Sequence, residues 1–158
     1  MTNPKSIIAT ATYSPKRIWR KLMVTISTSA FIHYKVRLRL LKWAGVKFKG
    51  QAFIGSNVTF DGINPELITI GEGAVITSGT CILTHFYSTR DSLFYIGEVN
   101  IGDKVFIGMN TLIVNAVNIG DNAVIGAGSI VTCDIPAGEV WAGNPARFIK
   151  KLTIEALR

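Results

Sequence analysis

Histidine, cysteine and long apolar runs are all scarce in this chain, and each scarcity narrows what the protein can be. Its 158 residues include two cysteines, Cys81 and Cys133, which are too few for a disulfide framework, so we expect free thiols in a reducing cytosol. They also include two histidines, His33 and His85, which gives no basis for a zinc site with three histidine ligands. We therefore expect no metal centre.

The apolar runs are too short to cross a membrane. The best candidate, residues 22–32, is eleven residues long and is interrupted by serine and threonine. A membrane-spanning helix needs about 20 predominantly apolar residues. The first residues also lack the apolar centre of a secretory signal. These features predict a cytoplasmic protein without a transmembrane helix.

Acidic residues are missing from the first part of the chain. Residues 1–60 contain eleven Lys or Arg and no Asp or Glu. Residues 61–158 contain six Lys or Arg and ten Asp or Glu, so the net charge of +7 combines a basic part with an acidic part. Such a split predicts two structural regions with different surroundings.

A hexapeptide period runs through the second region. The aliphatic residues recur every six positions, and a glycine follows four of these six. The period matches neither an α-helix nor an isolated β-strand, and it predicts a parallel β-helix in which three hexads form one triangular coil. The glycine should permit a tight corner where a Cβ would be costly. The periodic aliphatic residues are Ile101, Ile107, Ile113, Ile119, Ile125 and Val131.

The coils can be aligned on one another. Residues 101–118 lie over residues 119–136, residues 70–87 fit the same frame, and Phe48, Ile54 and Phe60 begin a looser first coil. No coil buries its interior alone, so the coils must stack. We expect a β-helix domain over residues 46–145, interrupted by a loop insertion at 86–100. Residues 146–158 should form a short C-terminal helix or tail.

Residues 1–45 are predicted to be a basic, helical N-terminal segment. Ser14 is a candidate N-cap, Pro15 suits the first helical position, and Gly45 a helix end. The alternation near residues 34–39 also allows a strand. The segment can cap the open end of the β-helix or lie on an anionic membrane, and the two roles are compatible. No nucleic-acid-binding motif accompanies the charge. His33 is expected to be a structural or surface residue.

The repeat and several motifs resemble the hexapeptide-repeat acyltransferases, in particular the maltose, galactoside, xenobiotic and polysaccharide O-acetyltransferases. The resemblance covers residues 46–152 and implies a left-handed parallel β-helix, an all-β fold, and a homotrimer. It also implies transfer of an acetyl group from acetyl-CoA to a hydroxyl of a saccharide, such as a lipid-linked or capsule glycan precursor. The motifs are "PELITIG", "ILTH", "VFIG", "IGAGSIVTCDIP" and "AGNPAR".

His85 is the candidate catalytic residue. It stands where the repeat is interrupted, and loops on rigid scaffolds often carry functional residues. A histidine without a function, on the surface of a loop, is the alternative. Histidine is suited to general-base catalysis near neutral pH. The resemblance implies this role for His85. In the stacking frame Asp61 falls close to it and could orient it, with Glu66 and Asn57 as weaker candidates; a turn before Pro65 is the alternative for Asp61.

The resemblance also implies residues on the substrate side. The corner around Gly108 and Met109 should supply a backbone N–H for the developing oxyanion, and the acceptor should meet Asn57 and Phe106. Acetyl-CoA should lie in a groove between subunits. Its predicted contacts are Gly108, Met109, Gly126, Ala127, Thr132, Arg147 and Lys150.

Three features leave alternatives open. Relatives often carry Lys where this chain has Cys133, so the resemblance does not supply that phosphate contact here. Arg147 and Lys150 could be a solvated basic end of the chain, and Phe106 could be an ordinary apolar residue at a corner.

The alternative functions are N-acetyl transfer to an amino sugar and a non-catalytic assembly or binding protein. A zinc hydratase on the same solenoid lacks histidine ligands, and Cys81 has no evident base for acylation.

Overall fold

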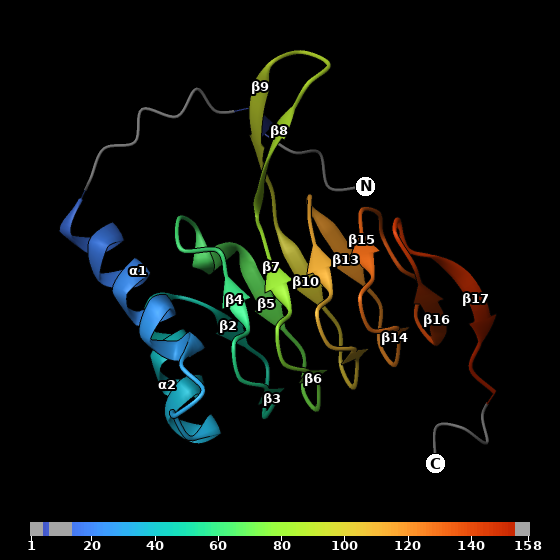
Figure 1. Cartoon of the computed structure of the whole chain (residues 1–158), viewed down its shortest axis with the longest axis horizontal. Coiled ribbons are helices and arrows are strands. Elements are labelled where there is room, and N and C mark those ends of the chain that lie inside the picture. The colour runs from blue at the N-terminus through green and yellow to red at the C-terminus, as the bar shows by residue number, and fades with distance from the viewer. Residues whose placement is uncertain (1–4, 7–13, 154–158) are drawn as a thin grey trace.

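Coils of short parallel strands, stacked in three columns and joined by turns, make up most of the chain (Figure 1). The computed structural model describes residues 5–6 and 14–153. The four coils contain β2 (Lys47–Phe48), β3 (Phe53–Ile54) and β4 (Thr59–Phe60); β5 (Ile68–Ile70), β6 (Val75–Ile76) and β7 (Cys81–Ile82); β10 (Val99–Ile101), β11 (Phe106–Ile107) and β12 (Leu112–Ile113); and β13 (Val117–Ile119), β14 (Val124–Ile125) and β15 (Ile130–Val131).

The strands of successive coils pair in register and form three sheets. The first sheet has the order β13-β10-β5-β2, the second contains β14-β11-β6-β3, and the third is β15-β12-β7-β4. In the second sheet Ile54, Ile76, Ile107 and Ile125 are successive register partners. This confirms that the hexad residues stack from one coil to the next.

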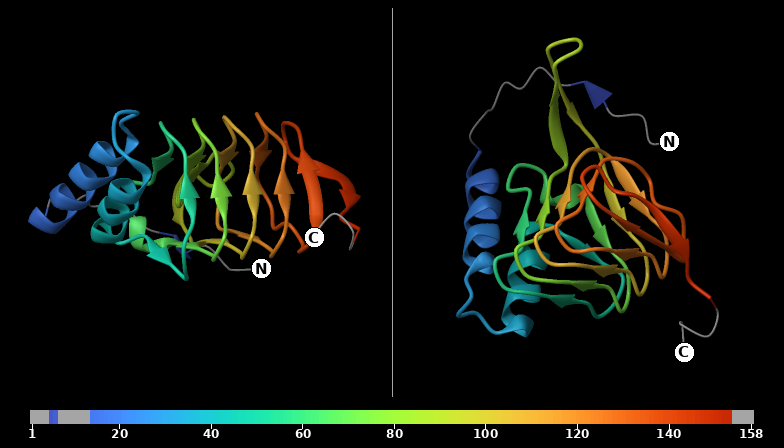
Figure 2. Two further views of the ribbon diagram at one scale, coloured as in Figure 1. Left: turned by 90° about the horizontal axis from the view of Figure 1, so that it is seen from below. Right: turned by 45° about the vertical axis from the view of Figure 1, so that its right-hand side comes forward.

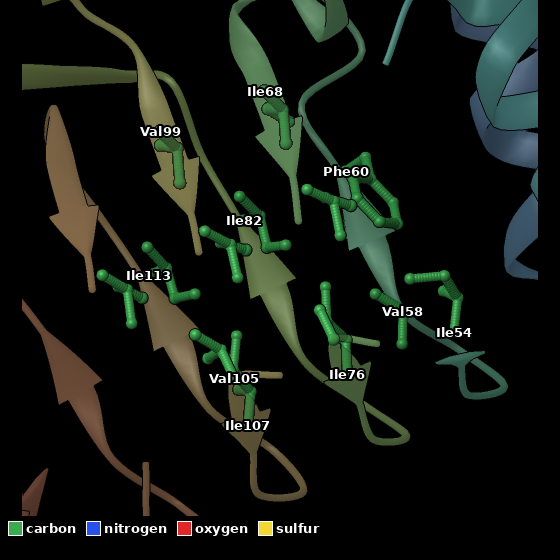
Figure 3. Close-up of a cluster of buried hydrophobic side chains, with 14 of the residues drawn as sticks. Ile54, Val58, Phe60, Ile68, Ile76, Ile82, Val99, Val105, Ile107 and Ile113 are labelled. Carbon is green, nitrogen blue, oxygen red and sulfur yellow. The ribbon is translucent and has the colours of Figure 1, made fainter. Parts of the chain in front are cut away.

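The stacked aliphatic side chains form the core. Ile54, Ile76, Ile82, Ile107 and Ile113 have no exposed surface, and Figure 3 shows them pointing into the space between the strands. Burying each such side chain contributes about 1.5–3 kcal/mol. Because every coil supplies its share of one continuous core, the corners of the solenoid are held in fixed positions.

The glycine after each aliphatic residue acts differently from our expectation. The positive φ of a corner falls two residues later, as at Asn110 with φ 56°. Gly108 is instead needed for close stacking, because a Cβ there would lie 2.4 Å from the backbone nitrogen of Ala127 in the next coil. A side chain is excluded, as predicted, but by the neighbouring coil and not by the dihedral angle.

The basic N-terminal segment contains helices α1 (Pro15–Thr28) and α2 (Tyr34–Ala44). Ser14 accepts a hydrogen bond from the Arg17 amide as the N-cap of α1, and Gly45 ends α2 in the left-handed conformation with φ 116°. The helical prediction is confirmed, and the strand alternative is excluded. His33 caps α2 by accepting a hydrogen bond from the Lys35 amide. No helix within residues 14–153 has the length and hydropathy that a bilayer span requires.

The two helices cover the open end of the first coil (Figure 2). Arg37 of α2 is 3% exposed and donates hydrogen bonds to the backbone carbonyls of Ser27, Ser29, Ile32 and Ile54, at 2.8–3.2 Å. Those carbonyls belong to the end of α1, the turn after it and β3. One buried guanidinium therefore joins the helical cap to the β-helix.

Residues 147–151 form a strand, where we expected a short C-terminal helix or tail. β16 (Glu139–Ala142) adds to the second sheet beside β14, and β17 (Arg147–Lys151) returns antiparallel to it. A strand forms here because the open edge of the second sheet offers backbone hydrogen bonds. Residues 154–158 lie outside the described residues.

Candidate active site

Two insertions emerge at the same corner of the solenoid. At regular corners the aliphatic positions are six residues apart, but Ile70 follows Phe60 by ten positions and Ile101 follows Ile82 by nineteen. Both insertions leave the third sheet and return to the first. Phe60 and Ile82 are register partners, so the insertions lie one above the other. The longer one projects from the solenoid as a hairpin (Figure 1).

Asp61 begins the shorter insertion and accepts hydrogen bonds from the longer one. Its side chain is buried, with 2% of the residue exposed. Oδ1 accepts from the Ile63 amide at 2.7 Å, and Oδ2 accepts from the Thr84 amide at 2.9 Å and from the Thr84 hydroxyl. His85 Nδ1 lies 2.6 Å from the same Oδ2. The predicted proximity of Asp61 and His85 is present in the structure.

The environment of Asp61 keeps it ionised. Burial raises the pKa of this carboxyl, but the hydrogen bonds from the Thr84 hydroxyl, the Ile63 amide, His85 and the Thr84 amide together lower it below its usual value. An ionised carboxylate only accepts hydrogen bonds. His85 must therefore donate from Nδ1, which leaves the lone pair of the neutral ring on Nε2.

Nε2 of His85 is the reactive position of this arrangement. The side chain is 30% exposed, whereas that of Asp61 is fully buried. Across residues 14–153 no hydrogen bond engages Nε2. A neutral imidazole held at one nitrogen and open at the other can take a proton from a hydroxyl that approaches from solvent.

The hairpin β8–β9 carries an aromatic pair on the same face as His85. β8 (His85–Ser88) pairs antiparallel with β9 (Leu93–Ile96), with His85 opposite Ile96 and Tyr87 opposite Phe94. Alternate residues share a face, so these four residues point the same way. The rings of Tyr87 and Phe94 lie 5.1 Å apart and are 50% and 47% exposed. β1 (Lys5–Ser6) extends the sheet beside β9.

Sequence reasoning missed Thr84, Tyr87 and Phe94. Thr84 is buried beside Asp61, a place that only the stacking of the two insertions reveals. The aromatic residues of 86–95 were visible in the sequence, but their faces depend on the hairpin register. That register pairs Tyr87 with Phe94 and leaves Phe86 stacked on Tyr95 on the other face.

Two weaker candidates for orienting His85 are wrong. Glu66 binds Arg20 of α1 at 2.7 Å. Asn57 lies at a different corner, between β3 and β4, where it has φ 56° and its amide donates to the carbonyl of Thr28. It is exposed there, and its contact with an acceptor stays a prediction.

The predicted cofactor corner is separate from the His85 corner of the same chain. Met109 and Ala127 lie between the second and third sheets and occupy equivalent positions one coil apart, since Ile107 pairs with Ile125. Phe106 is 42% exposed on the outer face of the second sheet. His85 lies at the corner between the third and first sheets. One chain alone therefore does not bring these residues together.

Free backbone donors line the cofactor corner. The N–H groups of Gly108 and Gly126 are used, because they donate to the carbonyls of Ile125 and Trp141 at 2.8 Å. Gly108 is thus unavailable as an oxyanion donor, contrary to our expectation. The next residue in each coil makes no backbone N–H hydrogen bond within residues 14–153. In the last three coils these residues are Ser78, Met109 and Ala127.

The remaining predicted cofactor residues are exposed. Thr132 follows β15, and its carbonyl accepts from the Asn115 side chain at 3.3 Å. Arg147 and Lys150 lie on β17, where every residue is exposed. The guanidinium of Arg147 donates to the adjacent Ala146 carbonyl at 2.9 Å. The cationic ends are accessible, and their contact with phosphate stays a prediction.

Cys81 is unsuited to nucleophilic catalysis. Burial first, and then the negative charge of Asp61, raises the pKa of its thiol. A protonated thiol is a weak nucleophile. A groove of about 410 Å³ on the first sheet, which Thr69, Asn100 and Asn118 help to line, contains none of the predicted site residues. Within residues 14–153 no three His, Cys, Asp or Glu side chains gather as metal ligands would.

Comparisons with known proteins show the same repeat and the same fold. Residues 98–133 match the family model "Bacterial transferase hexapeptide (six repeats)". The YvoF protein of Bacillus subtilis (strain 168), named as a candidate acetyltransferase, is 46% identical over 85 residues, which are 54% of this chain and 48% of YvoF. The chain spans about half the length of the curated relatives that it matches.

Solved structures are similar over most of the chain. A maltose O-acetyltransferase from Clostridium difficile 630 has a TM-score of 0.67 and 27% identity, covering 87% of each chain. A galactoside acetyltransferase in complex with coenzyme A has a TM-score of 0.70 and 27% identity, covering 89% of this chain and 82% of the other. The predicted left-handed parallel β-helix is thereby confirmed. In its repeat and its fold, the chain is thus similar to hexapeptide-repeat acetyltransferases.

Proposed function

We propose that the protein is an O-acetyltransferase that moves an acetyl group from acetyl-CoA to a hydroxyl of a saccharide, with His85 as general base. The observation that supports the proposal is the hydrogen-bonded series Thr84–Asp61–His85. In it a buried carboxylate holds one imidazole nitrogen and leaves the other open. The fold relationship to maltose and galactoside acetyltransferases supports acetyl-CoA and a saccharide as substrates.

The reaction follows from the tautomer of His85. Nε2 takes the proton of the acceptor hydroxyl while its oxygen attacks the carbonyl carbon of the acetyl thioester. The C–S bond then breaks, and the imidazolium returns the proton to the departing CoA sulfur. Asp61 is a positioning residue: it holds Nδ1–H and stabilises the imidazolium that forms in between. No acyl-enzyme is needed, in keeping with the protonated state of Cys81.

The free backbone donors suit acetyl-CoA. The Met109 N–H is the available donor at the corner predicted to stabilise the oxyanion, since Gly108 is already bonded. Ser78 and Ala127 continue the line in the neighbouring coils and can bind the amide carbonyls of a pantetheine arm. Arg147 and Lys150 can meet the phosphates by charge. Thr132, Gly108 and Gly126 complete the predicted binding set.

A homotrimer would complete the site. His85 and Met109 lie at different corners of the triangular solenoid, so a base and an oxyanion donor can face each other only across a boundary between two chains. In a three-fold assembly each boundary would contain both. This arrangement places the His85 corner of one subunit against the Met109 corner of its neighbour.

The acceptor side is built from aromatic surface. Tyr87 and Phe94 stand on the face of the hairpin that carries His85, and both are about half exposed. Aromatic faces pack against the C–H groups of sugar rings. Phe106 and Asn57 are the predicted contacts from the solenoid. A lipid-linked or capsule glycan precursor at the cytoplasmic face of a membrane is the acceptor class that we favour.

Transfer to the amino group of an amino sugar is the second enzymatic candidate, since the same base would serve an amine. A non-catalytic assembly role is the third. The experiment is the release of CoA thiol from acetyl-CoA, measured with a panel of monosaccharides, amino sugars, oligosaccharides and glycolipids. Transfer that persists fully in His85→Ala, or a failure to bind acetyl-CoA at all, would contradict the proposal.

A further inference from the structure

An apolar stripe on α1 faces solvent. Ile18, Trp19, Leu22 and Ile26 are 56%, 51%, 48% and 39% exposed. At 100° per residue they share one side of the helix. The opposite side is buried against the rest of the cap through Met23, Val24 and Ser27. The helix is thus apolar on two faces, and its packing in this chain covers only one of them.

The turn after α1 continues this surface. Phe31 is fully exposed, at 100% of its accessible area, between α1 and α2. Both helices lie at the N-terminal end of the solenoid, with α1 outermost (Figure 2). An apolar surface of this size on one helix and its following turn marks a site of interaction. We refer to Ile18, Trp19, Leu22, Ile26 and Phe31 as the end surface.

The charges around the end surface are all positive. Lys16, Arg17 and Lys21 are exposed on α1 itself. On α2 the exposed Lys35, Arg39 and Lys42 add to them, and residues 14–60 contain no Asp or Glu. Arg20 is the exception on α1, because it pairs with Glu66. An apolar stripe flanked only by cations is complementary to an anionic lipid surface.

We propose that α1 is a membrane-docking helix that lies flat on an anionic bilayer with Ile18, Trp19, Leu22 and Ile26 in the acyl–headgroup boundary. A second copy of the same surface is a poorer partner, because two such surfaces would bring like charges together. Docking in the plane of the bilayer also fits the length of α1, which at fourteen residues is too short to span it. This role does not depend on the transfer reaction.

Docking would set the position of the candidate site. Lys21 of α1 packs against Gly62, the residue after Asp61: a Cβ on Gly62 would meet the Lys21 side chain at 3.4 Å. The helix on the membrane is therefore adjacent to the turn that holds the His85 partner. If the proposed function holds, the acceptor hydroxyl is one carried close to the bilayer surface, as on a lipid-linked glycan.

Vesicle binding of the full chain tests the proposal. Vesicles of phosphatidylglycerol and phosphatidylcholine in equal parts should bind the protein at low ionic strength, and pure phosphatidylcholine vesicles should bind it at least about tenfold more weakly. The double variant Ile18→Glu/Leu22→Glu should lose at least about tenfold in binding to the anionic vesicles. Ile149→Glu is the matched control, since Ile149 is 57% exposed on β17, and it should bind like the native protein.

Two further measurements separate the possible outcomes. Circular dichroism melting establishes that the double variant is folded, and sedimentation equilibrium establishes its oligomeric state. A native protein that does not bind anionic vesicles, or a folded double variant that binds them fully, overturns the proposal. So does a double variant that changes oligomeric state and keeps its vesicle binding, because the end surface would then be a subunit interface.

The same variants keep this inference separate from the proposed function. CoA release with a soluble saccharide should be equal in the native protein and in Ile18→Glu/Leu22→Glu, because the substitutions are not in the site. The native protein and the double variant could both fail to transfer acetyl groups while the native protein still binds anionic vesicles. That result would refute the proposed transfer reaction and would support membrane docking by α1.

Discussion

Asp61 Oδ2 lies 2.6 Å from His85 Nδ1, although the two residues belong to different coils and are 24 positions apart in the chain. The pair exists because Phe60 and Ile82 stack in register and each is followed by an insertion. The contact is therefore a product of the solenoid itself and needs no flexible loop to form.

This pair predicts how stability depends on pH. The hydrogen-bonded Asp61 has a pKa below its usual value in the folded state, so its contribution is present above the ordinary Asp pKa of about 3.9 and is lost as the pH falls through the lower, folded value. Urea unfolding across this range should show the difference between native protein and Asp61→Asn shrinking on acidification. The exposed Glu98→Gln should leave the native curve unchanged; the same shrinkage in that variant would contradict the assignment.

The two histidines give a matched test of the base. His85→Ala should lower kcat by about 10²-fold or more, since general-base catalysis contributes 10²–10⁴-fold. Acetyl-CoA should still bind, measured by calorimetry, because Met109 and Ala127 keep their backbone donors.

His33→Ala should keep kcat and instead lose about 1 kcal/mol of stability, because His33 is the N-cap of α2. Equal kcat values for the two variants would exclude the proposed role of His85.

The aromatic pair on the hairpin should act on the acceptor alone. Tyr87→Ala and Phe94→Ala should raise the KM for an oligosaccharide acceptor by about five- to tenfold, as expected for loss of about 1 kcal/mol of ring packing. The KM for acetyl-CoA should not change. Phe86→Ala, on the opposite hairpin face, is the control, and an equal rise in that variant would indicate loss of the hairpin and not of a sugar contact.

The stacking glycine predicts a large loss of stability. Gly108→Ala places a Cβ 2.4 Å from the Ala127 backbone nitrogen, so two coils must separate locally. We expect a loss of about 2 kcal/mol or more, measured by thermal unfolding. Gly128→Ala meets no atom within 4 Å but has φ +70°, and it should lose only about 1 kcal/mol. A cost for Gly108→Ala that is no larger than that for Gly128→Ala would contradict the assigned role of the coil contact.

The burial of Arg37 predicts that the helices α1 and α2 unfold together when this residue is replaced. Arg37→Met leaves the carbonyls of Ser27, Ser29, Ile32 and Ile54 without their donor and should destabilise the protein by about 3–5 kcal/mol. Arg39→Met, on the exposed side of α2, should stay within about 0.5 kcal/mol of the native value. Hydrogen exchange should show α1 and α2 losing protection together in Arg37→Met, while β10–β15 keep theirs.

The hexad spacing was sufficient to predict the β-helix and the proximity of the candidate site residues. A strict six-residue period fixes which residues are register neighbours, so the proximity of Asp61 and His85 followed from counting alone. The helix ends followed in the same way from Ser14, Pro15 and Gly45, whose chemistry is local. Predictions of this kind depend on neighbouring residues or on an exact repeat.

Other features depend on contacts that a linear pattern does not encode. In the sequence, Arg37 does not differ from the other basic residues near it. It is buried because four backbone carbonyls from α1, the following turn and β3 converge on its guanidinium. The faces of Tyr87 and Phe94 follow from the hairpin register, and β17 from an open sheet edge at the end of the solenoid. The N–H of Met109 is free and that of Gly108 is not because of a hydrogen bond between coils, which the sequence does not encode.

Strand β17 has a consequence for the length of the molecule. A stack of identical coils has no inherent last member, and two chains could in principle join end to end into a fibre. Here the final strand reverses direction and presents an entirely exposed row that includes Arg147, Lys150 and Lys151. This strand lies at one end of the described coils and the helices α1 and α2 lie at the other, so neither end presents a bare coil on which a second chain could stack.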